Sequence, residues 1–153
     1  MTKIEAGTTI ARTTDEVWNF MLDVSNGPKW IPGQLEGKVT SDGPIGVGSR
    51  IQVKNSAWPH LIEFHVMGYE PGRKITMDVI APQMMKGSTE TFAIEGAEGR
   101  TNVTLTMNLK LHGLSSLLGP FVVPSLRKGA VTEVGNLKRI LESGDKSESD
   151  SLL

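Results

Sequence analysis

The chain has 153 residues, 38% of them hydrophobic and 22% charged, which suits one globular domain with a buried core and leaves no room for a second. Its 16 Lys and Arg side chains nearly balance 17 Asp and Glu side chains, and the net charge of -1 excludes a strong overall field for nucleic acid or anionic lipid, although not a local basic patch. The absence of cysteine excludes disulfides, thiolate metal sites and cysteine nucleophiles.

The beginning of the sequence predicts neither export nor membrane insertion. Residues 1–5 lack the basic and apolar regions of a signal peptide, and no stretch approaches the ~18 apolar residues of a membrane span. We therefore expect a cytoplasmic protein without a membrane span.

The first elements are a strand followed directly by a helix. Residues 4–10 alternate between apolar and polar side chains, which predicts a half-buried strand. Thr13 and Glu16 have the spacing of a capping box, in which each side chain accepts a hydrogen bond from the backbone N–H of the other. A second short helical turn over residues 29–33 should pack Trp30 against the end of the sheet.

From Leu35 the hydrophobic period changes to two and stays there for most of the chain. Turn residues, mostly glycine and proline, interrupt it at intervals, as expected for antiparallel strands joined by hairpins. In the last strand, threonine, asparagine and lysine alternate with apolar residues, so one face of this sheet meets water. The predicted strands are 34–41, 48–55, 58–69, 73–81, 87–95 and 101–111.

After Gly113 the period becomes helical, with an apolar stripe at spacings of three and four. The stripe consists of Leu126, Ala130, Val134, Leu137 and Leu141. Pro124 would remove a backbone hydrogen bond from a helix already under way, so a kink or a restart is expected there. Polar composition predicts a disordered acidic tail over 143–153, after a single domain over 1–142.

The order of these elements resembles the helix-grip superfamily, which includes START-like (SRPBCC) and Bet v 1-like proteins, and in particular the polyketide cyclase/dehydrase and lipid-transport family. The segments that carry the resemblance are 10–23, 30–33, 41–50, 69–74 and 126–141. It implies an α+β helix-grip fold, with a seven-stranded curved antiparallel sheet wrapped around a long C-terminal helix and two short helices after the first strand. It also implies a cavity for apolar or polycyclic ligands, without a shared catalytic signature.

The cavity is expected near the N-terminal half of the long helix. A curved sheet is not filled along its whole length by one helix. The residues at the start of the helix fill less volume than the stripe that follows; they are Gly119, Pro120, Val122, Val123 and Ser125. Two apolar loops should form the rim, 82–86 with Met84 and Met85, and 114–119 with Leu118. Methionine adapts to varied ligand shapes, but these two methionines are equally well explained as gap fillers or incidental surface.

Alternation along the strands and spacing along the helix predict which side chains face the cavity. These are Trp58, His60, Ile62, Met77, Glu90, Phe92, Met107, Val122 and Leu126. His60 and Glu90 are the only candidates for catalysis, as a base and an acid, because desolvation raises the pKa of a carboxyl toward neutrality. The strand between them separates the two by about 9–10 Å, so they would meet only through a ligand or water.

Simpler alternatives exist for both residues. His60 and Glu90 would face solvent at a strand end or a bulge, and a bulge in the strand of His60 would instead turn Glu63 or His65 inward. The spacing of the histidines, including His112, does not fit a metal site, and no cofactor is expected.

Three functions agree with these observations. The first is binding or transport of a hydrophobic small molecule such as a lipid, polyketide or isoprenoid, which needs only the fold and an apolar lining. The second is a polyketide cyclase or dehydrase that works mainly by orienting its substrate. The third is a protein-interaction module that uses the outer face of the sheet or the acidic tail. The outer face of the sheet is only mildly basic, so binding of nucleic acid is not expected. As a separate expectation, the protein should be a monomer or a homodimer.

Overall fold

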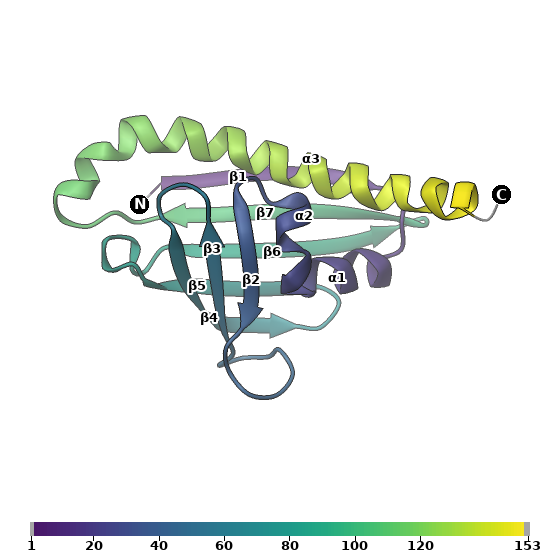
Figure 1. Cartoon of the computed structure of the whole chain (residues 1–153), viewed down its shortest axis with the longest axis horizontal. Coiled ribbons are helices and arrows are strands. Elements are labelled where there is room, and N and C mark those ends of the chain that lie inside the picture. Colours follow the sequence, from purple (N-terminus) through teal and green to yellow (C-terminus); the bar gives the residue numbers. More distant parts are fainter. Residues whose placement is uncertain (1, 152–153) are drawn as a thin grey trace.

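The computed structural model describes residues 2–151, with side chains described as far as residue 143. One strongly curved antiparallel sheet of seven strands, in the order β1-β7-β6-β5-β4-β3-β2, lies beneath a long helix (Figure 1). The predicted α+β helix-grip architecture is thus confirmed. The strands are β1 (Thr2–Ile10), β2 (Gln34–Val39), β3 (Arg50–Asn55), β4 (Leu61–Glu70), β5 (Lys74–Ala81), β6 (Thr89–Ala97) and β7 (Arg100–Leu109).

Two short α-helices follow β1, as predicted. They are α1 (Thr14–Leu22) and α2 (Gly27–Trp30), with the 3-10 turn η1 (Val24–Asn26) between them. The Thr13 hydroxyl accepts a hydrogen bond from the Glu16 N–H at 3.3 Å and donates one to Oε1 of Glu16 at 3.1 Å. The second half of the box differs from the prediction, because the Glu16 carboxylate accepts from the Thr13 hydroxyl.

The chain closes with η2 (Gln83–Met85) before β6, η3 (Gly113–Leu118) after β7, and the long helix α3 (Gly119–Ser151). Helix α3 does not restart at Pro124, which lies inside it. The backbone carbonyl that loses its partner there is that of Pro120, in the exposed first turn, where it is open to solvent. Helix α3 also passes the predicted domain limit at 142; the side chains of 144–153 lie outside the described residues, so the disordered tail stays a prediction.

Strand β4 keeps Ile62, Phe64 and Val66 on the concave face of the sheet. Two register shifts interrupt the pairing of β4 with β5, one between Glu63 and Phe64 and one between Val66 and Gly68. The second leaves Met67 exposed and lets Tyr69 pack against the core. Glu63 and His65 point away from the core, because Oε1 of Glu63 accepts from Gln52 and His65 Nδ1 lies 3.4 Å from Asp78 Oδ1. The alternative that places Glu63 or His65 inside is therefore not what the structure contains.

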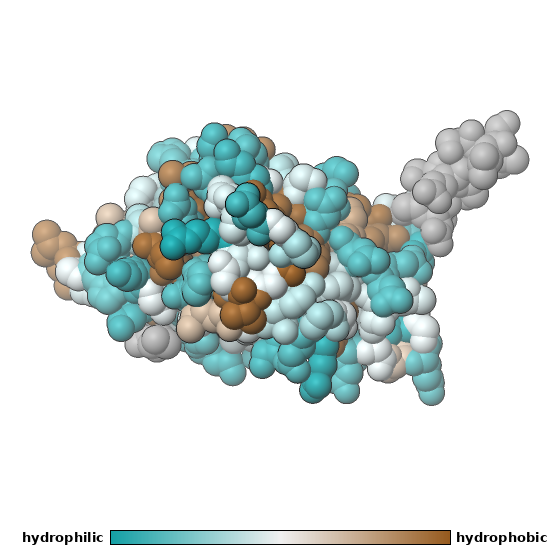
Figure 2. Space-filling view, turned by 90° about the horizontal axis from the view of Figure 1, so that it is seen from below, coloured by the Kyte–Doolittle hydropathy of each residue, from teal (hydrophilic) through white to brown (hydrophobic). Residues whose placement is uncertain are grey.

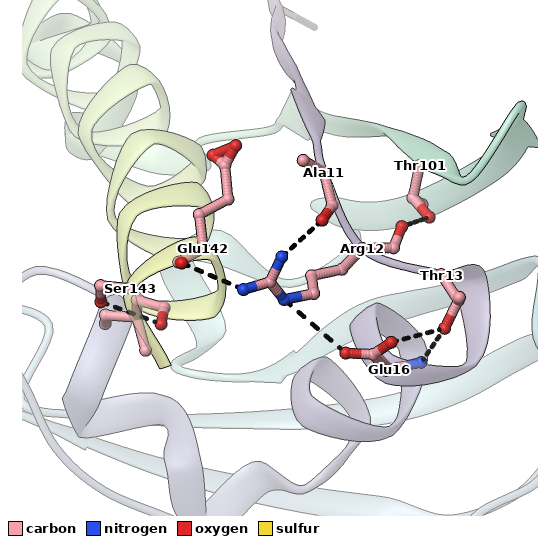
Figure 3. A network of polar contacts seen from close by, with 8 residues as sticks. Ala11, Arg12, Thr13, Glu16, Thr101, Glu142 and Ser143 are labelled. Carbon is pink, nitrogen blue, oxygen red and sulfur yellow. Dashed lines mark hydrogen bonds and ion pairs between the residues drawn. The ribbon is translucent and has the colours of Figure 1, made fainter. Parts of the chain in front are cut away.

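The far end of α3 is anchored to the end of β1 through Arg12 (Figure 3). Its guanidinium donates to the carbonyl of Ala11 at 2.7 Å and to the carbonyl of Glu142 at 3.0 Å, and Nε lies 3.8 Å from Oε2 of Glu16. One side chain thus joins β1, α1 and the C-terminal half of α3.

The packed core draws on β1, α1, β4, β7 and α3. The largest fully buried side chains of the described chain are Ile4, Ile10, Val17, Val66, Thr101, Val103, Leu105 and Leu137. Within the described residues no helix combines the length and the apolar character needed to cross a membrane.

Candidate ligand-binding cavity

A cavity of about 400 Å³ lies between the concave face of the sheet and the helices. The sheet and the β2–β3 loop contribute Gln34, Ile45, Ile51, Val53, Asn55, Ile62, Phe64, Ile75, Met77, Glu90, Phe92 and Met107. The segment from α1 to the start of β2 contributes Met21, Leu22, Val24, Gly27, Trp30, Ile31 and Pro32, and α3 contributes Ser125, Leu126, Gly129, Ala130 and Glu133.

The space is open because α3 presents small side chains to it. Ser125, Gly129 and Ala130 leave a gap that the curved sheet does not close, whereas further along the helix Val134 and Leu137 are fully packed. The cavity therefore lies beside the N-terminal half of α3, where the sequence predicts it. Trp30 closes one wall by packing edge-on against Phe92, with ring centroids 5.8 Å apart.

The ionisable side chains of the lining are all acidic. Gln34, Asn55 and Ser125 are neutral, Glu90 and Glu133 are acids, and no Lys, Arg or His lies among the lining residues. Glu90 is half-buried on β6, where Met77 and Met107 flank it in register on the neighbouring strands, and the Glu133 side chain on α3 is only 7% exposed. Two carboxyls thus share a mostly apolar space.

Burial changes the acidity of both groups. It raises the pKa of Glu90 from 4.5 to about 7. The pKa of Glu133 is raised well above its ordinary value, first by burial and second by the charge of Glu90. Within the described part of the chain, no hydrogen-bond donor or cation is in contact with either carboxyl. Near neutral pH the pair therefore holds protons that exposed carboxyls would have lost.

The cavity brings together six of the residues predicted from alternation and helical spacing. These are Ile62, Met77, Glu90, Phe92, Met107 and Leu126. That they bind a ligand stays a prediction, whereas their common location in one cavity is a feature of the structure.

Trp58 and His60 lie outside the lining. Strand β4 begins at Leu61, so both residues belong to the β3–β4 loop, where alternation no longer decides which way a side chain points. Trp58 is 48% exposed, and His60 is exposed with Nδ1 3.4 Å from the backbone oxygen of Asn55. The predicted acid–base pair of His60 and Glu90 is therefore not assembled in this structure.

The predicted rim residues are also absent from the lining. Met84 in η2 and Leu118 in η3 are exposed, while Met85 packs against the edge of the core. Val122 is half-buried on α3, one turn before Leu126. The two loops thus project beyond the cavity at one end of the molecule.

Sequence reasoning missed Glu133, the most buried ionisable group of the lining. The signal was present, because Glu133 lies three residues after Ala130 and four before Leu137, within the apolar stripe of the helix. An acid inside such a stripe predicts a polar group directed at the core or at a cavity. Among the described residues, no group of three or more His, Asp or Glu side chains is arranged to hold a metal.

Comparison with known families agrees with this geometry. The family model described as polyketide cyclase / dehydrase and lipid transport matches residues 1–142. The chain belongs to this family. No curated protein matches the sequence. The polyketide cyclase/dehydrase family is therefore assigned from the family model, and solved structures add the fold.

Several solved structures share the fold. The Zhui aromatase/cyclase from Streptomyces sp. R1128 is 13% identical, with a TM-score of 0.75 over 93% of this chain and 94% of that one. The protein TTHA0849 from Thermus thermophilus is 12% identical, with a TM-score of 0.75 over 94% and 99%. The Aha1 dimer from Colwellia psychrerythraea is 21% identical, with a TM-score of 0.68 over 94% and 98%. At such identities these likenesses concern the fold alone.

Proposed function

We propose that this member of the polyketide cyclase/dehydrase and lipid transport family binds and carries an apolar small molecule in the cavity between the sheet and α3. The observation that supports this is the 400 Å³ space itself. Protein interiors are close-packed, and an empty apolar cavity lowers the free energy of unfolding. A cavity of this size in a small domain therefore favours a role in ligand binding. Its volume falls within the range of small-molecule sites.

The lining also restricts the ligand. An apolar wall with two carboxyls favours a molecule that is mostly hydrocarbon or aromatic, with one polar group able to meet Glu90 and Glu133. A protonated carboxyl donates a hydrogen bond and an ionised one accepts, so a hydroxyl or a carbonyl on the ligand finds a partner. A ligand carrying its own carboxylate would repel an ionised member of the pair, so fatty acids should bind less well than the corresponding alcohols.

Filling the cavity from α3 tests the proposal. Gly129 lines the cavity and its Cβ position is open, so Gly129→Phe should place a ring where the ligand lies. We expect binding of the neutral fluorophore N-phenyl-1-naphthylamine, measured by fluorescence titration, to weaken at least tenfold. Gly135→Phe is the matched control, because Gly135 is an exposed glycine of the same helix outside the lining. If both variants bind the fluorophore as tightly as the wild type, the fluorophore does not bind in this cavity.

A second function, acid–base catalysis on an enolisable ligand, is favoured by one observation. Burial holds the pKa of Glu90 at about 7, which is close to the pH at which a general acid or base is most effective. The ionised form would remove a proton beside a ligand carbonyl, and the protonated neighbour Glu133 would donate a hydrogen bond to the oxygen that becomes negative.

Hydrogen exchange of a ketone distinguishes this function from simple binding. We expect the protein to accelerate loss of the α-proton signals of 2-decanone in D₂O, followed by NMR, with a rate that rises as pH passes through about 7. Glu90→Gln should abolish the acceleration without weakening binding of N-phenyl-1-naphthylamine, whereas Glu36→Gln, on the outer strand β2 beside Lys54, should leave it unchanged. If the wild-type protein does not make the α-protons of 2-decanone exchange faster than they do in buffer alone, catalysis is excluded and ligand transport remains the proposed function.

A further inference from the structure

One end of the molecule exposes large apolar side chains on neighbouring turns. We call this set the apolar tip, and it consists of Met84 on η2, Leu114, Leu117 and Leu118 on η3, and Phe121 at the start of α3. Leu114 is 85% exposed and Phe121 79%. Figure 2 shows hydrophobic side chains projecting at its left end, which corresponds to the end of Figure 1 where the chain turns into α3. Soluble monomers rarely leave such residues clustered without a partner.

Hydrogen bonds hold the two turns side by side. The N–H of His112, just before η3, donates to the carbonyl of Met84 at 3.0 Å, and Nε2 of His112 lies 2.7 Å from the carbonyl oxygen of Lys86. The Ser88 hydroxyl donates to the carbonyl of Lys110 and accepts from its N–H, at 3.1 and 2.9 Å. The tip is therefore one surface built from two segments, with the cations Lys86 and Lys110 at its base.

The charges at this end have one sign. The strand directions place the loops 56–60, 82–88 and 110–118 at the same end of the sheet, and none of them contains Asp or Glu. The first helical turns continue this pattern, since 119–132 contains Arg127 and Lys128 and no acid. At the opposite end, the loops after β2, β4 and β6 contain both signs, with Asp42, Arg73 and Glu98. The loops of the tip end thus carry only cations, whereas those of the opposite end are mixed.

We propose that the apolar tip docks on the surface of an anionic lipid bilayer. Leucine and phenylalanine side chains of the tip enter the boundary between headgroups and acyl chains, and Lys86 and Lys110 stay among the anionic headgroups. Trp58 lies on the third loop of this end, and tryptophan favours the same interfacial zone. Together the three loops offer Lys86 and Lys110 and no acid, which complements the charge of anionic headgroups.

Docking at this end would bring the cavity close to the membrane. Asn55, Ile62 and Glu90 line the cavity, and each is the first or second residue of its strand counted from one of these loops. A ligand passing between bilayer and cavity would then have a short path. Membrane docking itself does not depend on the proposed ligand, so the two proposals fail separately.

Co-sedimentation with lipid vesicles tests the docking. We expect the wild-type protein to bind vesicles of phosphatidylcholine with 30% phosphatidylglycerol at least tenfold more tightly than pure phosphatidylcholine vesicles, and high salt should reduce the difference. The triple variant Leu114→Ser, Leu117→Ser, Phe121→Ser should lose at least tenfold in affinity for the anionic vesicles. Lys86→Glu with Lys110→Glu should remove the preference for anionic lipid.

A control variant and a second readout keep the result specific. Val47→Ser changes a side chain that is 69% exposed in the loop after β2, at the opposite end, and should bind vesicles like the wild type. The triple variant should keep the urea unfolding transition of the wild type, which shows that it is folded whether or not the cavity binds a ligand. Undiminished vesicle binding by the triple variant would overturn the proposal. So would a wild-type dimer in analytical ultracentrifugation that the triple variant converts to a monomer, because the tip would then be an interface between copies.

Discussion

Replacing Glu90 with Gln is expected to stabilise the protein at pH 8 by about 3 kcal/mol and to leave its stability at pH 4.5 nearly unchanged. The native state raises the pKa of Glu90 to about 7 from 4.5, so between these values the folded chain keeps a proton that the unfolded chain releases. Stability therefore falls as the pH rises from 4.5 through 7 and then levels off. Gln is neutral at every pH and removes this loss.

Urea unfolding between pH 4.5 and 9 measures the effect. Glu133→Gln should act in the same direction, because the pKa of Glu133 is raised by burial and by the charge of Glu90. Glu36→Gln is the control, since Glu36 is exposed and its carboxylate lies 3.5 Å from Lys54, and its effect should stay within about 0.5 kcal/mol. A double variant of Glu90 and Glu133 that keeps the wild-type dependence on pH would show that these carboxyls ionise normally in the folded protein.

Replacing Gly37 with Ala is expected to destabilise the protein by about 1–3 kcal/mol, the range found for overpacked sites. A Cβ at this position of β2 would lie 2.5 Å from the backbone oxygen of Val24 and 2.7 Å from Nε2 of Gln34. The side chain of Gln34 can move, but the Val24 carbonyl belongs to η1 and moves only with the backbone. The strand and the turn must therefore separate.

The same urea measurement at one pH decides this prediction. Gly46→Ala is the matched control, because a Cβ at Gly46 meets nothing within 4 Å and its φ lies outside the left-handed region. We expect Gly46→Ala to change the free energy of unfolding by less than about 0.5 kcal/mol. If the two variants are equally stable, a Cβ at position 37 fits between η1 and β2, and the prediction is wrong. Because Val24 and Gln34 both line the cavity, Gly37→Ala should also weaken binding of the fluorophore.

Periodicity predicted most of the fold because each period corresponds to one backbone geometry. The alternation in β7 places Val103 and Leu105 in the core, and the helical stripe places Ala130, Val134 and Leu137 there. The cavity does lie beside the N-terminal half of α3, but of the small residues that the sequence reasoning named there only Ser125 lines it; Gly129 and Ala130 supply the rest of the gap. Periodicity predicts the direction of a side chain only within a helix or strand, so it gives no information about residues in the adjoining loops.

The errors at the candidate site follow from that limit. Trp58 and His60 were assigned by extending the alternation of β4 backward across its first residue, Leu61, into a loop where it has no meaning. Glu133 was overlooked because a charged residue on a long helix is normally solvated, and only its place in the stripe marks it as buried. The proximity of Glu90 and Glu133 depends on how α3 crosses the sheet, which no local pattern contains.

The division of the interior into a filled core and a cavity has a consequence for how this protein can diverge. None of the largest fully buried side chains of the described chain lines the cavity, although other core residues, among them Phe64 and Phe92, do. Substitutions at half-buried lining residues such as Val53, Ile62 and Met107 can therefore alter what is bound while the fully buried core stays unchanged. A scaffold divided in this way can keep its shape over long evolutionary times while its chemistry changes, and a TM-score of 0.75 at 12% identity shows how far sequences of this shape have drifted apart.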